Sequence, residues 1–232
     1  MAVLFDLDGV LIDSLALHRR VWEQWAVGHG LDPLHVFEST FGRRPVDTIR
    51  DVAGHLPAED ELARLDTLLD LEVDAVTLQP GALRAVQAAS GGKWAIVTST
   101  EQRRAREYLS RLGCPTPEVV VGGTDVANGK PAPDGYLAAA ERLRVATAAC
   151  VVVEDAPAGI EAARRAGAAV VAVATTRSAS ELGEADLIVA ELTAAVDLLQ
   201  AWAQDPPDDL PQRDRLLAAC SPRHPGPHRQ PE

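Results

Sequence analysis

The stretch AVLFDLDGV, residues 2–10, decides the fold class because it joins a short apolar run to a pair of acids. The run Ala2-Val3-Leu4-Phe5 is typical of a buried strand. A strand that ends in charged residues presents them at the edge where open α/β sheets bind ligands. Asp6 and Asp8 hold two like charges close together, and these repel unless a cation lies between them or one is protonated. The stretch therefore predicts a strand followed by a metal or phosphate site.

Short apolar runs alternate with helical patterns in the second half of the chain. The runs that predict strands are 94–97, 119–121, 150–153, 170–173 and 187–189. Helices are predicted for an Arg-rich stretch ending near Leu112, for Asp134 to Leu143 and for Ala156 to Ala166. Such alternation indicates a parallel sheet with helices on both faces. We expect an α/β fold with a Rossmann-like, doubly wound parallel sheet.

Residues 15–77 carry helical patterns and no convincing strand. His18, Val21, Trp22 and Trp25 form one stripe of an amphipathic helix, which Gly28 and Gly30 end. Further helices are predicted near 45–53 and 59–76. We expect three parts. These are a core domain of residues 1–14 and 78–204, an inserted helical cap domain of residues 15–77, and a flexible Pro-rich tail of residues 205–232.

Composition limits the kinds of partner. The chain has 232 residues, 47% of them hydrophobic, and a formal net charge of −12. A phosphate backbone requires clustered Lys and Arg, so we expect no nucleic acid as a partner. Small phosphorylated substrates stay open because a few local cations can bind them. We expect a monomer.

The cysteines and the apolar runs indicate the compartment. Cys114, Cys150 and Cys220 are far apart and have no metal-binding spacing, which is typical of free thiols in a reducing compartment. No stretch reaches the roughly 18 consecutive apolar residues that a membrane span needs. The chain shows no signal-peptide pattern. We expect a cytoplasmic protein without membrane contact.

Further polar residues follow the predicted strands and should meet the first two acids. In a parallel sheet, strand ends of one polarity converge on one crevice. The residues expected there are two hydroxyls, a cation and two acids: Thr98, Ser99, Lys130, Glu154 and Asp155. Oxygen ligands of this kind favour Mg²⁺. A carboxylate can also attack phosphorus, while a cation offsets the charge on the transferring group.

Two motif comparisons exclude other phosphate and metal sites. An EF-hand loop that began at Asp6 would need Asp or Asn, Gly and Glu where Val10, Leu11 and Leu17 stand. A Walker A loop around Lys130 would need a glycine at position 124 and Ser or Thr at position 131. The chain has Thr124 and Pro131 there. Neither a calcium loop nor a P-loop is predicted.

Each of the candidate residues also has a purely structural interpretation when taken alone. Asp8-Gly9 suits a turn, and Thr98 and Ser99 suit helix N-caps. Glu154 and Asp155 would complement a helix dipole. His18, on the apolar stripe, is more typical of a packed core histidine than of a ligand. The order of the residues and their placement at strand ends favour a site.

Together the segments resemble the haloacid dehalogenase superfamily of phosphohydrolases, in the branch with a helical cap after the first strand. The segments that carry the resemblance are FDLDGVLIDS, AIVTST, NGKPAPDGYL and VVVEDAPAGIEAARRAG, which occur in the family's order and spacing. The resemblance covers residue 2 to about 190. It implies a Mg²⁺-dependent enzyme that forms an aspartyl-phosphate.

The resemblance also implies a role for each motif residue. Asp6 is the nucleophile, and Asp8 is the general acid and then the base. Thr98 and Lys130 hold the phosphoryl oxygens. Mg²⁺ is held by the Asp6 carboxylate, the Asp8 carbonyl and Asp155, with Glu154 acting directly or through water. We expect further substrate contacts from Ser99, His18 and Arg43.

Within the family, the wording of the last two motifs is similar to phosphatases of sugar phosphates and polyol phosphates, such as hexose, hexitol, deoxyhexose and glycerol phosphates. The alternative is a phosphomutase of the β-phosphoglucomutase type. His18 lies where that mutase carries a functional histidine, but Pro45 stands near the place of its cap arginine. A non-catalytic binding module is a third hypothesis, and it would be expected to lack residues such as Asp6 or Lys130. We predict a phosphatase.

Overall fold

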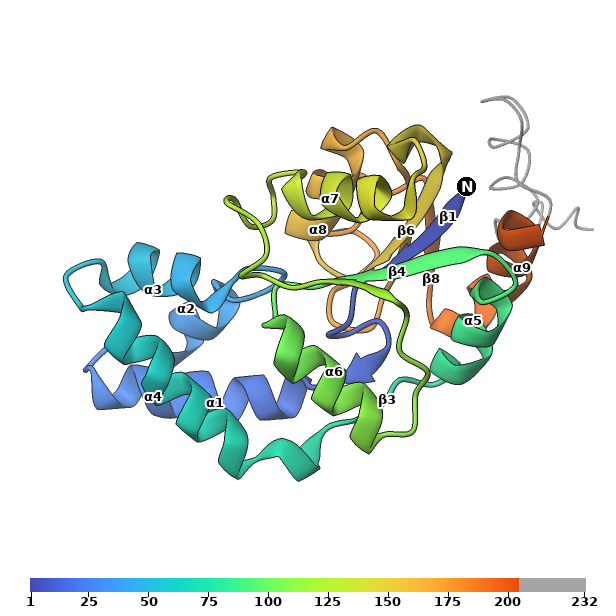
Figure 1. Ribbon diagram of the computed structural model, residues 1–232. Coiled ribbons are helices and arrows are strands. Elements are labelled where there is room, and N and C mark those ends of the chain that lie inside the picture. Colours follow the sequence, from blue (N-terminus) through green and yellow to red (C-terminus); the bar gives the residue numbers. More distant parts are fainter. Residues whose placement is uncertain (205–232) are drawn as a thin grey trace, which may run out of the picture.

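A six-stranded parallel sheet forms the centre of the molecule in the computed structural model, which describes residues 1–204 (Figure 1). The first strand pairs with the fourth on one side and with the sixth on the other. In spatial order the strands are β5 (Val119–Val121), β4 (Lys93–Val97), β1 (Ala2–Phe5), β6 (Cys150–Glu154), β7 (Ala169–Val173) and β8 (Leu187–Val189). The predicted parallel sheet is confirmed. The tail predicted for residues 205–232 lies outside the described residues.

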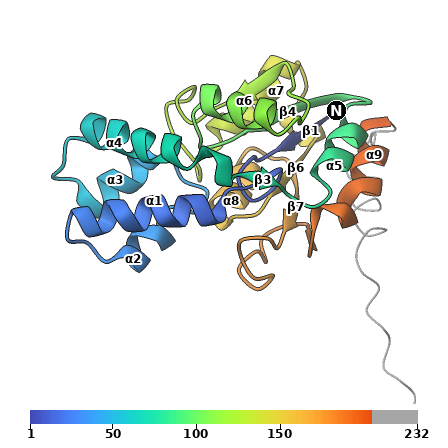
Figure 2. The same ribbon diagram turned by 90° about the horizontal axis from the view of Figure 1, so that it is seen from below.

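Helices cover both faces of the sheet, so the predicted doubly wound fold is also confirmed (Figures 1 and 2). Val3 and Phe5 of β1 belong to one hydrophobic cluster, with side chains of α5 (Ala82–Ala89), α6 (Gln102–Arg111) and α9 (Val196–Gln204). Ala2 and Leu4 belong to a second cluster, with α7 (Asp134–Leu143) and α8 (Pro157–Arg165). Both faces of β1 are therefore buried, which explains its continuous apolar run.

Four of the five helices between β1 and β4 form a group beyond one end of the sheet (Figures 1 and 2). We call this group the helical insert; it consists of α1 (Leu15–Gly28), α2 (Pro33–Glu38), α3 (Pro45–Ala53) and α4 (Ala58–Leu71). Val21, Trp22 and Trp25 of the predicted α1 stripe are buried. The division of the chain into a core domain and a cap domain stays a prediction.

Several short elements differ from the predictions. The helix predicted for 59–76 ends at Leu71, and a 3₁₀ turn, Val73–Ala75, follows. Two-residue strands, β2 (Ile12–Asp13) and β3 (Thr77–Leu78), pair antiparallel where the chain leaves and re-enters the core. The expectation of no strand over 15–77 is therefore wrong at Thr77. A two-residue strand shows no period, so its pairing cannot be found from a pattern.

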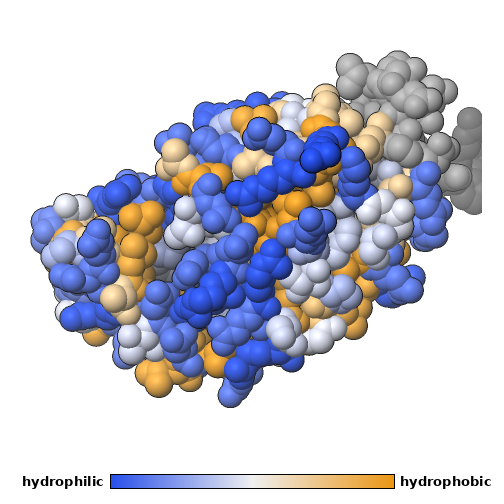
Figure 3. All heavy atoms as spheres, viewed as in Figure 1, coloured by the Kyte–Doolittle hydropathy of each residue, from blue (hydrophilic) through white to orange (hydrophobic). Residues whose placement is uncertain are grey.

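The face seen in Figure 3 is covered mostly by hydrophilic residues, with apolar patches between them. The large apolar side chains that are exposed come from separate elements: Val27, Leu34, Leu71, Leu83 and Leu137. Scattered exposed apolar residues of this kind are ordinary on a protein surface. Among residues 1–204, the helices are all too short or too polar to span a membrane.

Candidate active site

Three buried carboxylates meet at the C-terminal ends of β1 and β6. These two strands pair in parallel with Phe5 opposite Val153, so Asp6 emerges beside Glu154. Carboxylate oxygens of Asp6, Glu154 and Asp155 lie within 4.8 Å of one another. The exposed fractions of the three residues are only 5%, 0% and 4%. The pairing of two central strands therefore creates a concentrated, buried negative charge.

Lys130 supplies positive charge to this cluster. Its ammonium group donates a hydrogen bond to Asp6 Oδ1 and another, of 2.6 Å, to Glu154 Oε1. A third contact, of 3.3 Å, reaches the backbone carbonyl of Val97 at the end of β4. Burial alone would lower the pKa of Lys130, but the charges of Asp6 and Glu154 outweigh it and hold that pKa above its ordinary range. Lys130 is therefore a fixed cation.

The positive charge of Lys130 does not balance the cluster. Burial, opposed by Lys130 and reinforced by the neighbouring acids, raises the pKa of Asp6 well above its ordinary value. Burial and the charge of Glu154 raise the pKa of Asp155 to about 8. The raised pKa values of Asp6 and Asp155 both indicate that the site is short of positive charge. A donor set of buried carboxylate oxygens with such a deficit fits a hard divalent cation.

Glu154 is saturated by donors from the protein itself. Its Oε1 accepts a 2.6 Å hydrogen bond from the buried Tyr136 hydroxyl in addition to that from Lys130. Its Oε2 accepts from the backbone N–H groups of Asp155 and Ala156, at 3.1 and 3.4 Å. Both oxygens of this carboxylate are therefore occupied. The arrangement fixes Lys130 and the turn after β6 in place.

Asp8 lies in a separate set of hydrogen bonds. Ser14 donates to its Oδ1 at 2.6 Å, and Thr100 and Thr98 donate to its Oδ2 at 2.8 and 3.4 Å. His18 Nε2 lies 3.4 Å from Oδ1. Although burial opposes it, the contacts with His18, Ser14 and Thr100 lower the pKa of Asp8 to about 2. Without substrate, the Asp8 carboxyl is therefore ionised.

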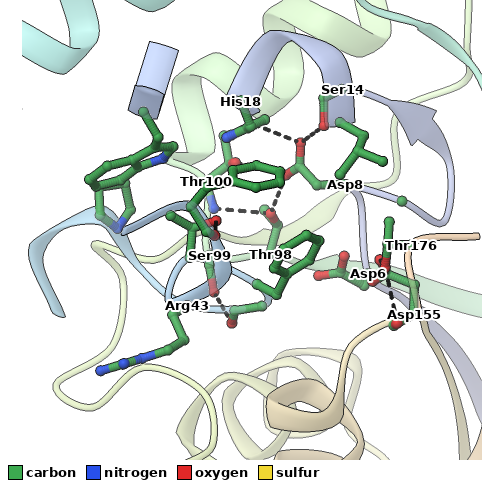
Figure 4. A pocket seen from close by; sticks show the side chains of 18 residues that line it. Asp6, Asp8, Ser14, His18, Arg43, Thr98, Ser99, Thr100, Asp155 and Thr176 are labelled. Carbon is green, nitrogen blue, oxygen red and sulfur yellow. Dashed lines mark hydrogen bonds and ion pairs between the residues drawn. The ribbon is translucent and has the colours of Figure 1, made fainter. Parts of the chain in front are cut away.

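A cavity of about 90 Å³ opens over these acids and extends to the helical insert (Figure 4). We call its two ends the acidic end, formed by Asp6, Asp8 and Asp155 over Lys130 and Glu154, and the aromatic wall. The aromatic wall consists of three aromatic side chains and one leucine: Trp22, Phe37, Phe41 and Leu15. The cavity therefore joins a charged region to an apolar one, as many small-molecule sites do.

The structure brings the predicted substrate contacts to this cavity but engages each in a protein contact. His18, Arg43 and Ser99 all line it. Ser99 Oγ donates a 2.8 Å hydrogen bond to the carbonyl of Gly42. Arg43 pairs with Asp51 at 2.5 Å, and in Figure 4 its side chain extends away from Asp6 and Asp155. His18, half-buried at the cavity, is not a packed core residue.

Four residues of the site were not predicted from the sequence. Ser14 and Thr100 bind Asp8, Tyr136 binds Glu154, and the Thr176 hydroxyl donates to Asp155 Oδ2. Three of them stand inside the motif segments: Ser14 ends FDLDGVLIDS, Thr100 ends AIVTST, and Tyr136 lies in NGKPAPDGYL. Thr176 follows β7 and lies in none of these segments.

Comparison with known proteins identifies the family. Residues 1–167 match the haloacid dehalogenase-like hydrolase family. Hexitol phosphatase A of Escherichia coli is 40% identical over 194 residues, covering 82% of this chain and 90% of that protein. 2-Deoxyglucose-6-phosphate phosphatase 2 of Saccharomyces cerevisiae is 31% identical, covering 82% and 87% of the two chains. The protein therefore belongs to the haloacid dehalogenase-like hydrolases, as the resemblance implied.

A solved structure agrees with this assignment at the level of the fold. The β-phosphoglucomutase of Clostridium difficile superposes with a TM-score of 0.73 at 24% identity, covering 83% of this chain and 91% of that chain. At this identity the likeness shows a shared architecture. It does not separate a hydrolase from a mutase, which depends on the residues of the cavity.

Proposed function

We propose that the protein, a phosphoric monoester hydrolase, releases inorganic phosphate from a small sugar phosphate or polyol phosphate. The observation that carries this proposal is the two-ended cavity, with a carboxylate–lysine cluster at one end and an aromatic wall at the other. The first end suits a phosphoryl group, and the second suits the carbon-bound face of a small polyol. The likeness to a hexitol phosphatase favours a hexitol phosphate among these substrates.

Asp6 is the proposed nucleophile. A carboxylate oxygen of Asp6 forms a bond to phosphorus while the phosphorus–oxygen ester bond breaks, and an aspartyl-phosphate results. Lys130 lies against Asp6 and offsets charge on the phosphoryl oxygens during transfer. Thr98, whose Oγ1 accepts a 3.0 Å hydrogen bond from Thr100 N–H, is the proposed hydroxyl contact to a phosphoryl oxygen.

Asp8 is the proposed proton carrier. In the first step the protonated Asp8 gives its proton to the oxygen of the departing alcohol. In the second step the ionised Asp8 takes a proton from the water that attacks phosphorus, and this proton restores the acid form for the next turnover. This second step breaks the bond between Asp6 and phosphorus and regenerates both carboxyl groups. The hydrogen bonds from Ser14 and Thr100 suit the base form, because donors stabilise the ionised carboxylate.

Mg²⁺ is the proposed cofactor, and Asp6 and Asp155 are its proposed carboxylate ligands, with the Asp8 carbonyl as a third. When bound, Mg²⁺ supplies Lewis-acid polarisation of a phosphoryl oxygen and charge neutralisation. Glu154 is not proposed as a direct ligand, because Lys130, Tyr136 and two backbone N–H groups occupy its oxygens. In that place Glu154 orients Lys130 and Asp155.

The phosphomutase alternative needs a second phosphate site, since a mutase passes through a bisphosphate. Arg43 is the one Lys or Arg among the described residues that line the cavity, and it is paired with Asp51. The adjacent Arg44 is bonded to Asp47 at 2.6 and 2.9 Å. Both guanidinium groups are thus paired with carboxylates of the helical insert, which favours hydrolysis.

A phosphate-release screen tests the proposal. Purified protein with Mg²⁺ is assayed against hexitol, hexose, deoxyhexose and glycerol phosphates, with Asp6→Asn as the matched control. We expect release from at least one hexitol or hexose phosphate, and a loss of more than about 10⁴-fold in the variant, because the nucleophile is removed. Absence of release across the panel would exclude the substrate class.

A coupled assay separates the mutase. We expect no conversion of β-glucose 1-phosphate to glucose 6-phosphate, with or without a bisphosphate primer. Conversion that depends on the primer and is lost in His18→Ala would establish the mutase instead. A monomeric state and a cytoplasmic location also stay predictions, which size-exclusion chromatography and cell fractionation would test.

A further inference from the structure

One short segment of the helical insert closes the cavity and rests on the core. We call Thr40–Pro45, which joins α2 to α3, the docking segment. Five of its residues line the cavity: Thr40, Phe41, Gly42, Arg43 and Pro45. Arg44 is the one member that does not line it. The side chain of Arg44 turns instead toward the core loop that leads from β5 to Lys130.

Arg44 makes a set of contacts on this loop that depends on its forked shape. The two N–H bonds of its Nη1 are divided among the carbonyls of Gly123, Val126 and Ala127, at 3.2, 3.1 and 3.2 Å, so one of them is shared between two acceptors. Its Nε and Nη2 bind the two oxygens of Asp47 at 2.6 and 2.9 Å. The side chain is only 12% exposed. A planar guanidinium can satisfy all these acceptors at once, whereas an ammonium group cannot.

The loop leaves room for this side chain by means of two glycines. A Cβ atom at Gly129 would lie 2.5 Å from Arg44 Nε, and one at Gly123 would lie 3.1 Å from Arg44 Cγ. Gly129 directly precedes Lys130, the cation of the acidic end. The backbone around Lys130 and the side chain of Arg44 are therefore packed against each other without space for a larger residue.

Other core residues hold the same segment from different sides. Ser99 after β4 donates to the Gly42 carbonyl at 2.8 Å. The Arg177 guanidinium lies 3.8 Å from the centre of the Phe41 ring, a cation–π contact. Loops that follow β4, β5 and β7 thus all contact the docking segment. The position of the aromatic wall depends on these contacts, because Phe41 belongs to both.

We propose that Arg44 is a positioning residue for substrate selection: it holds the docking segment on the β5–Lys130 loop and so sets the distance between the aromatic wall and the acidic end. Arg44 touches no reacting group. Its loss removes no side chain of the acidic end and loosens the far end of the cavity. The kinetic part of this proposal rests on the proposed hydrolysis of a polyol phosphate, whereas the docking itself does not.

Limited proteolysis tests the docking without reference to activity. Trypsin cleaves after Arg43, inside the docking segment, and the cleavage rate follows the fraction of molecules in which the segment is released. We expect cleavage there to be about tenfold faster in Arg44→Ala than in wild type. The matched control is Arg50→Ala, which removes a guanidinium of the adjoining helix α3 that is 65% exposed and lies 3.9 Å from Asp47.

Kinetics of the same variants test the positioning role. We expect Arg44→Ala to lose about tenfold in kcat/KM for the polyol phosphate, mainly through KM. Inhibition by inorganic phosphate, which needs only the acidic end, should stay within about twofold. Arg44→Lys should restore little of the loss because it lacks the fork.

The outcomes separate the two proposals. Unchanged cleavage after Arg43 and unchanged KM in Arg44→Ala would overturn the positioning role, as would equal effects in Arg50→Ala. If no polyol phosphate is hydrolysed at all, the proposed function fails and proteolysis still decides the docking. If Arg44→Ala does not fold, Asp47→Asn, which weakens the same fork, is measured in the same two ways.

Discussion

The two ends of the cavity are built in different ways. At the acidic end three carboxylates are buried and that of Asp8 is partly buried. Each has a donor: Lys130 for Asp6, Tyr136 for Glu154, Thr176 for Asp155 and Ser14 for Asp8. The aromatic wall comes from the helical insert, and its residue Phe41 is only partly buried. Its residues hold no charge that faces the acids.

This difference separates the reaction from the choice of substrate. Charged groups at the end of a parallel sheet are fixed by strand pairing, and their fixed places suit a transition state that changes little between substrates. The aromatic wall belongs to loops and helices that other chains of the fold can vary without disturbing the sheet. Changes at the acidic end should therefore affect every substrate, and changes at the wall only some.

Removal of divalent cations should give the largest effect, because it leaves the acidic end short of positive charge. With EDTA we expect phosphate release to fall by about 10²-fold or more for every substrate, and Mg²⁺ to restore it. Activity that persists after chelation would contradict the assignment of Asp6 and Asp155 as metal ligands.

Tyr136→Phe removes a donor from Glu154 inside the core. Glu154 Oε1 then loses one of its two side-chain donors and keeps only Lys130. We therefore expect a loss of about 1–3 kcal/mol in the free energy of unfolding. Denaturant titration measures it. Tyr108→Phe is the control, because within residues 1–204 the buried Tyr108 hydroxyl has no hydrogen-bond partner. Equal losses in the two variants would show that Glu154 does not need the Tyr136 hydroxyl.

Trp22→Phe should act on the aromatic wall alone. The smaller ring enlarges the far end of the cavity, and we expect a shift of about tenfold in kcat/KM toward longer polyol phosphates over shorter ones. The inhibition constant of inorganic phosphate should not change. A uniform loss with all substrates would erase the distinction between the two ends of the cavity.

A smaller effect is expected inside the helical insert, away from the cavity. Although burial opposes it, hydrogen bonds from Trp25 and His29 hold the pKa of Glu61 below its ordinary value. A lowered folded pKa means that the ionised Glu61 stabilises the fold above its unfolded pKa, and that this contribution is lost as the pH falls through the folded pKa.

The test of this contribution is Glu61→Gln. We expect it to cost about 1 kcal/mol at neutral pH and nothing in acid, as measured by unfolding at several pH values. A difference between the two proteins that does not depend on pH would show that the charge of Glu61 contributes nothing.

The sheet could be predicted from the sequence because each of its main strands is a short apolar run between turns. The predicted runs at 119–121 and 187–189 coincide with β5 and β8. Helices α2, α5 and α9 were missed. The helix from residue 59 was predicted too long. It ends at Leu71, and the C-cap residue is Glu72 rather than a glycine or proline that would mark a stop.

The site could be predicted where its residues follow strands, and less well elsewhere. The meeting of Asp6, Glu154 and Asp155 follows from strand polarity alone. The contacts of Arg44 with three carbonyls of a distant loop depend on how the helical insert packs on the core, which no local pattern records. The same holds for Arg43, whose partner Asp51 could not be chosen among many acids.

The central claim is that Asp6 takes the phosphoryl group, and a trapped intermediate tests it most directly. A hexitol phosphate or another substrate found in the screen is mixed with the protein, the first turnover is quenched in acid, and the peptide that contains Asp6 is examined by mass spectrometry. We predict a phosphoryl group on Asp6, absent in Asp6→Asn. Turnover with no phosphoryl group on Asp6, or with one on another residue, would contradict the account.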